Sequence, residues 1–72
     1  MTVRTENITG SQPGATVECF SCGVDASAKI LFAVASLGHR DREQAWAKAY
    51  RHDSVFPSHD ILVEFVHKVK AE

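Results

Sequence analysis

The segment DASAKILFAVASLG, from Asp25 to Gly38, decides the expected fold. Asp25 is a residue type that caps helix amino termini, alanines recur over residues 26–37, and Gly38 suits the left-handed conformation that ends many helices. Nearly the whole surface of such a helix is apolar, which predicts that it lies in the middle of the domain. A buried strand over Ile30–Val34 is the alternative, because periodicity does not separate helix from strand in a short apolar run.

Two strands joined by a turn are expected before this segment. The runs Thr2–Thr9 and Ala15–Phe20 are rich in β-branched residues, which favour strands. Residues 10–14 between them, Gly-Ser-Gln-Pro-Gly, have the composition of a turn. A β-hairpin is the simplest structure that accounts for this pattern.

Two further helices are expected after this segment. The first begins at Asp41, which forms an Asp variant of the capping box with Gln44, and it runs to about His52 with Trp46 in the core. The second is predicted over residues 59–70, behind a bend. We favour a helix there because its apolar residues share one arc, whereas one face of a strand would mix Leu, Glu, Val and Lys side chains.

These elements together predict a single small α+β domain over residues 1–72, with an amino-terminal β-hairpin followed by two or three packed helices. A domain this short buries only about 60% of the surface of its unfolded chain, so we expect it to depend on a metal, a partner or self-association. No apolar run approaches the ~20 residues that span a bilayer, and residues 1–10 lack the pattern of a signal peptide. We therefore expect a soluble, cytoplasmic protein with no membrane partner.

Cys19 and Cys22 form a CxxC motif that is followed by Gly23. In zinc knuckles this spacing lets a tight turn bring two thiolates to one tetrahedral ion. Among the four histidines, His52 and His59 flank one connection between expected helices and are the candidates to complete a site, but their spacing matches no common zinc finger. The favoured interpretation is two small buried apolar side chains at a turn and no cofactor, with zinc as the alternative.

A thiol redox site is a third interpretation of this motif. The expected helix begins about three residues after Cys22, and its dipole would stabilise a thiolate. Residues 17–22 followed by Ala28–Leu31 resemble a glutaredoxin active site, and this resemblance implies redox activity at Cys19 and Cys22. A thioredoxin-like fold also needs more strands and a cis-proline segment, which the sequence does not visibly supply.

A second resemblance covers Val17–Gly23 and the expected helix over Arg42–Arg51. These segments are similar to the second half of the Lar-type restriction-alleviation zinc ribbons of phages, which pair two cysteine knuckles and follow the second with a Glu- and Ala-rich helix ending in Trp. The first cysteine pair is absent from this chain. The resemblance implies a small phage-encoded module that contacts host restriction or nucleic-acid machinery.

Charge is segregated along the chain, although its net value is only −1. The basic excess lies in residues 26–53, where the helix expected to begin at Asp41 presents cations to solvent. We predict a non-enzymatic regulatory protein that binds the acidic surface of another protein through this face and through the turn at Cys19–Gly23. The candidate partner-binding residues are Arg40, Arg42, Gln44, Lys48 and Arg51.

A helix-turn-helix DNA-binding protein is the alternative function. Two helices joined at residues 38–41 would have its outline, and the same cations would face phosphate or guanine. The weak net charge argues against a chain that coats nucleic acid. We predict no catalytic residues, because so short a chain has little volume for an enclosing pocket.

Overall fold

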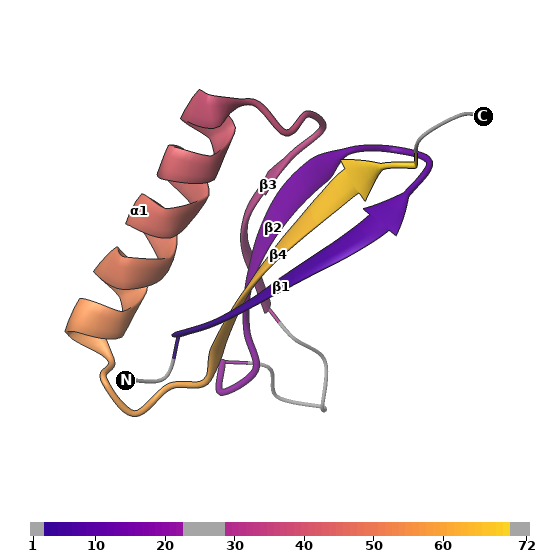
Figure 1. Cartoon of the computed structure of the whole chain (residues 1–72). Helices are drawn as coiled ribbons and strands as arrows, with labels where there is room; N and C mark the ends of the chain where they lie inside the picture. The colour runs from indigo at the N-terminus through magenta and orange to yellow at the C-terminus, as the bar shows by residue number, and fades with distance from the viewer. Residues whose placement is uncertain (1–2, 23–28, 70–72) are drawn as a thin grey trace.

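The computed structural model describes residues 3–22 and 29–69, which form a four-stranded mixed sheet with one helix packed on one face (Figure 1). β4 pairs parallel with β1 and antiparallel with β2, and β3 pairs antiparallel with β2, so the order across the sheet is β1-β4-β2-β3. In chain order the elements are β1 (Val3–Gly10), β2 (Gly14–Cys19), β3 (Lys29–Val34), α1 (His39–Val55) and β4 (Ile61–Lys68).

The expected amino-terminal hairpin is wrong, although both of its strands exist. β1 and β2 lie close to the predicted runs, but β4 is inserted between them. The backbone N–H of Val69, just after β4, donates to the carbonyl oxygen of Gly10 at 3.0 Å. In this central position β4 has hydrogen-bonding partners along both of its edges, and a favourable local turn does not outweigh that gain.

The buried helix predicted over residues 26–37 is also wrong wherever the structure describes this segment. Lys29–Val34 is strand β3, in agreement with the alternative interpretation of the run, while residues 26–28 lie outside the described part. β-branched and aromatic residues in the run favour a strand over a helix. The strand is not buried, however, because it forms an edge of the sheet and Ile30 is 59% exposed.

The helix predicted over residues 59–70 is strand β4 in the described residues. Alternate residues Ile61, Val63 and Phe65 are buried in the core under α1. Leu62 points to the opposite face, yet it is only 8% exposed. Because β4 is central, apolar residues occupy both of its faces, and the alternation that normally identifies a strand is weakened.

The structure confirms the helix predicted over residues 41–52, as α1, and corrects its start. The helix begins at His39, so Asp41 lies inside its first turn and is not the residue before it. The Asp41 carboxylate accepts hydrogen bonds from the Ser36 hydroxyl at 2.7 Å and from the Gly38 backbone N–H at 3.0 Å. The hydrogen bond from Ser36, and to a smaller extent that from Gly38, lowers the pKa of Asp41 below its ordinary value.

Small residues on one face of α1 let the helix approach the sheet closely. Ala45 and Ala49 are fully buried against it, and Trp46 packs on Phe65 with ring centroids 5.8 Å apart. The core is thin, and its largest fully buried side chains are Ile61, Val17, Val63 and Cys19. No helix within residues 3–22 and 29–69 has the length and apolarity needed to cross a membrane.

Candidate metal centre

Two thiols and two imidazoles meet at one end of the sheet, where β2 and α1 both end and the chain enters β4 (Figure 1). One ligand atom from each side chain lies within 4.8 Å of the other three. The four residues are Cys19, Cys22, His52 and His59, the same four that the sequence marks as alternative zinc ligands. We call them the metal cluster.

Strand pairing brings one cysteine and one histidine together. Cys19, the last residue of β2, pairs with Ile61, and the Phe20 N–H extends the ladder by donating to the Asp60 carbonyl oxygen at 2.9 Å. Since side chains alternate along an extended chain, His59 points to the same side as Ile61, toward α1. Its Nδ1 therefore lies 3.5 Å from the buried Sγ of Cys19.

The helix supplies the other histidine. His52 follows Ala49 on the face of α1 that packs against the sheet, and its Nε2 lies 3.6 Å from the Sγ of Cys22 and 3.2 Å from the Nδ1 of His59. Phe56, just beyond the helix, stacks on the His59 ring with a centroid distance of 4.7 Å and packs against His52 at 5.0 Å. The aromatic ring restricts both imidazoles to orientations that point at the thiols.

Four of the six separations between ligand atoms match a tetrahedral zinc site. Zn–S bonds of about 2.3 Å and Zn–N bonds of about 2.0–2.1 Å place sulfur and nitrogen about 3.5 Å apart and two nitrogens about 3.3 Å apart around one ion. The cluster has sulfur–nitrogen distances of 3.5, 3.6 and 3.5 Å and a nitrogen–nitrogen distance of 3.2 Å. These four separations fit one tetrahedral ion, and all four ligand atoms lie within 4.8 Å of one another.

Hydrogen bonding alone does not explain the same geometry. The Nδ1 of His59 faces three groups at once, the two sulfurs at 3.5 Å and the His52 nitrogen at 3.2 Å. A neutral imidazole nitrogen has either one proton or one lone pair, so it forms one good hydrogen bond and not three. A cation at the common centre satisfies all four atoms together.

Comparison with protein families, with curated proteins and with solved structures finds no match.

The surroundings of Cys22 and His52 favour the neutral form of each of these two side chains. A hydrogen bond with Cys19, then burial and the charge of Cys19, raise the pKa of the Cys22 thiol. Burial, then the nearby charges of His59 and Lys29, lowers the pKa of His52. A bound divalent cation reverses the preference at the thiols, because a coordinating thiol is deprotonated outright.

The described residues provide no support for the redox interpretation. It required a helix dipole near Cys22, but the next element that the structure describes is strand β3, and residues 23–28 lie outside the described part. A reactive thiol also needs a lowered pKa, whereas that of Cys22 is raised. A metal ligand needs neither feature, because the ion itself stabilises the thiolate.

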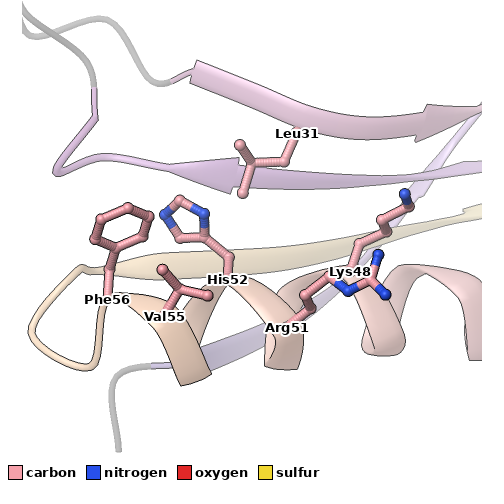
Figure 2. Close-up of a pocket in the computed structure, with 6 residues that line it drawn as sticks. All are labelled: Leu31, Lys48, Arg51, His52, Val55 and Phe56. Atoms are coloured by element: carbon pink, nitrogen blue, oxygen red, sulfur yellow. The ribbon is translucent and has the colours of Figure 1, made fainter.

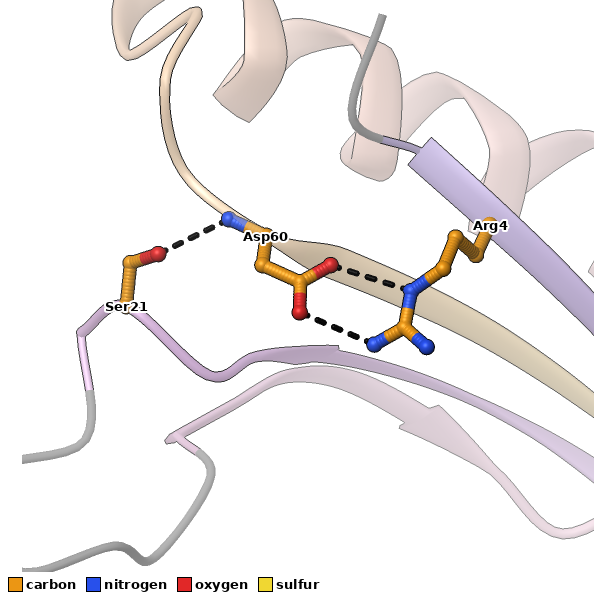
Figure 3. Close-up of polar contacts among 3 residues, drawn as sticks. All are labelled: Arg4, Ser21 and Asp60. Atoms are coloured by element: carbon orange, nitrogen blue, oxygen red, sulfur yellow. Dashed lines mark hydrogen bonds and ion pairs between the residues drawn. The ribbon is translucent and has the colours of Figure 1, made fainter.

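An outer set of contacts fixes the cysteine turn against the segment that carries His59 (Figure 3). The Asp60 backbone N–H donates to the Ser21 hydroxyl at 2.8 Å, and Ser21 lies between the two cysteines. On the opposite side of the chain, Arg4 of β1 donates from Nε and from one terminal nitrogen to the two Asp60 carboxylate oxygens, at 3.0 and 2.9 Å. These residues hold the loop in place without touching the ligand atoms, and the sequence analysis did not identify them.

Replacing Ser21 tests this outer support. Ser21→Ala removes the hydroxyl that accepts a hydrogen bond from the Asp60 N–H, so the cysteine turn is no longer bonded to the segment before β4. Loss of an outer contact at a metal site typically lowers metal affinity at least about tenfold. We therefore expect zinc affinity to fall about tenfold. Competition with a chromophoric chelator measures the change. Ser54→Ala, at an exposed position in α1, is the matched control and should leave the affinity unchanged. Equal affinities of the wild type and Ser21→Ala would contradict the supporting role.

The predicted partner-binding residues separate into two groups. Lys48 and Arg51 line a groove beside the metal cluster, whereas Arg40, Arg42 and Gln44 are exposed in the first part of α1, away from that groove. The helix-turn-helix outline is not formed, because the segment that would supply its first helix contains strand β3 in its described part. The cations thus belong to a helix packed on a sheet.

Proposed function

We propose that this protein is a small, non-enzymatic zinc-binding module in which one Zn²⁺ held by the metal cluster stabilises the fold and a partner protein binds to the exposed face of α1. The convergence of two thiols and two imidazoles, with four ligand-atom separations of 3.2–3.6 Å, is the observation that carries the zinc assignment. Four protein ligands leave no coordination position open to a substrate, which is the arrangement of structural zinc sites.

The ligand types select the metal. Two thiolates and two imidazoles in a tetrahedral arrangement are typical of zinc, whereas Ca²⁺ and Mg²⁺ bind oxygen ligands at higher coordination numbers. Each ligand comes from a different position in the fold: Cys19 ends β2, Cys22 follows it in the turn, His52 lies in the last turn of α1 and His59 precedes β4. One ion would therefore tie together three segments that are far apart in the sequence.

A structural ion suits a core of this size. Few large side chains are fully buried among the described residues, and alanines make up the buried face of α1. When a metal site does not exist in the unfolded chain, the free energy of metal binding adds to the free energy of folding. Zinc would supply the stabilisation that the small core does not.

The interaction part of the proposal rests on the exposed cations of α1. Arg40, Arg42, Lys48 and Arg51 are all exposed, and none forms an ion pair with the described residues. Such a surface attracts a partner that carries acidic groups. A phage origin and a contact with host restriction machinery stay predictions from the resemblance to the Lar-type zinc ribbons.

Native mass spectrometry of protein purified without added metal or chelator tests the zinc assignment. We expect one zinc ion per chain, with a mass increase equal to zinc less two protons, because both thiols deprotonate on binding. Cobalt substitution should give the visible bands of a tetrahedral ion with thiolate ligands. The double variant Cys19→Ser/Cys22→Ser is the control and should bind no ion. Metal-free wild-type protein, or equal metal content in the two proteins, would overturn the assignment.

A further inference from the structure

A groove of about 210 Å³ lies between α1 and β3, next to the metal cluster (Figure 2). Its lining divides into two chemically different parts. Leu31 of β3 and Val55 and Phe56 at the end of α1 form what we call the apolar end, and Lys48 and Arg51 form what we call the cationic rim. His52, one of the cluster ligands, lies between them (Figure 2).

The cationic rim lacks a counter-charge in the described part of the chain. Lys48 and Arg51 are three positions apart on α1, so two like charges are neighbours on the helix surface and destabilise it slightly. No acidic residue stands three or four positions before or after either of them. No ion pair joins either side chain to another described residue. The groove therefore offers two cations to an external anion.

The apolar end is unusually open for so small a molecule. Val55 is 63% exposed and Phe56 is 44% exposed, although both lie next to a groove into which an apolar side chain would fit. Apolar surface beside charged groups is typical of a binding site for a ligand that carries both kinds of group. A phosphate backbone would leave this apolar surface in water, so nucleic acid fits the groove poorly.

The strand that borders the groove has a free edge. β3 is the outermost strand of the sheet and pairs with β2 on one side, while no described residue pairs with its other side. An extended peptide can extend such a sheet by hydrogen bonds between main chains, and its alternate side chains then enter neighbouring pockets. The same strand supplies Leu31 to the apolar end of the groove.

We infer that this groove binds an extended, acidic segment of a partner protein. The segment adds beside β3, places one apolar side chain against the apolar end and sets a carboxylate against the cationic rim. The inference rests on the proposed function, because a zinc ion bound to His52 would fix one wall of the groove. The expected partner is thereby narrowed from any acidic protein surface to a linear motif with acidic and apolar residues.

A peptide selection tests the inference. Zinc-loaded wild-type protein is used to select from a phage library of short random peptides, and the enriched peptides are synthesised and measured by fluorescence anisotropy. We expect sequences in which an apolar residue stands close to Asp or Glu. Binding to Lys48→Glu/Arg51→Glu should be weaker by about tenfold or more, because two attractive charges become repulsive. Amide hydrogen exchange in Lys29–Val34 should slow when the peptide binds.

Lys68→Glu is the control, since it reverses a positive charge at an exposed position of β4 that does not line the groove. Its affinity for the selected peptides should equal that of the wild type to within about twofold. Each of three results overturns the inference: no enrichment, peptides without acidic residues, or equal loss of binding in Lys68→Glu and in the double variant. Zinc content is measured on every sample, so a failure of zinc binding is seen independently of a failure of peptide binding.

Discussion

Removal of zinc is expected to unfold the protein at temperatures where the zinc-loaded form is fully folded. At a free zinc concentration about 1,000-fold above the dissociation constant, binding adds about 4 kcal/mol to the free energy of unfolding. For a domain of this size, that loss corresponds to a fall in Tm of about 20 °C or more. Circular dichroism during thermal unfolding, with and without a chelator, measures the difference.

Restoring the metal provides the control for this experiment. Added Zn²⁺ should return Tm to its original value, whereas added Mg²⁺ should not, because neither thiolate nor imidazole suits that ion. The expected cause is the loss of the link between the turn after β2, the end of α1 and the loop before β4. A chelator that leaves Tm unchanged would show that packing alone holds these segments together.

Replacing His52 is expected to have the second largest effect. His52→Ala removes one of four ligands and opens the coordination sphere to water, so zinc affinity should fall by more than about 100-fold, beyond the loss typical of outer contacts. The variant should then unfold at the temperature of the metal-free wild type. Zinc titration followed by thermal unfolding measures both quantities on the same sample.

His39→Ala is the matched control because it changes the same residue type on the same helix. The His39 side chain is 87% exposed and contacts only the exposed Glu43 carboxylate, at 3.0 Å, among the interactions described. Exposed pairs of this kind contribute little to stability. Zinc affinity and Tm should therefore match the wild type. Equal effects of the two substitutions would mean that His52 acts as an ordinary surface residue and not as a ligand.

The helix was predictable from sequence and the strand arrangement was not. Residues around Ala45 and Ala49 show one small apolar face and one charged face, and the structure forms the helix that this periodicity predicts. Ile61–Phe65 lacks the alternation of a half-buried strand because β4 is central and both of its faces are partly covered. The sequence does contain a usable signal for a central strand, the continuous β-branched and apolar run at residues 61–63.

The hairpin failed as a prediction for a different reason. The turn between Gly10 and Gly14 is encoded locally, but the strand that separates β1 from β2 comes from Ile61–Lys68. Turn composition and strand propensity describe neighbours in sequence and contain no information about insertion of a distant strand. A short connection between two strands therefore does not establish that the strands pair.

The metal cluster was partly visible in the sequence. Cys19 and Cys22 follow from the motif, and His52 shares the helix face of Ala45 and Ala49, so it must point at the sheet. His59 has no such local signature, because its place depends on the pairing of Cys19 with Ile61 in the ladder between β2 and β4. The supporting contact between Arg4 and Asp60 also depends on strand pairing, because the two residues are far apart in the sequence. Local sequence patterns therefore do not predict it.

The parallel pairing of β1 with β4 delays the completion of this domain during synthesis. β1 finds its only described partner strand in a segment made more than fifty positions later, as the register Val3↔Ile61 shows. Contacts of such long sequence separation slow folding, into about the millisecond-to-second range for domains dominated by them. Until the ribosome releases residues 61–68, the nascent chain contains all four residues of the metal cluster but lacks the central strand on which the sheet closes.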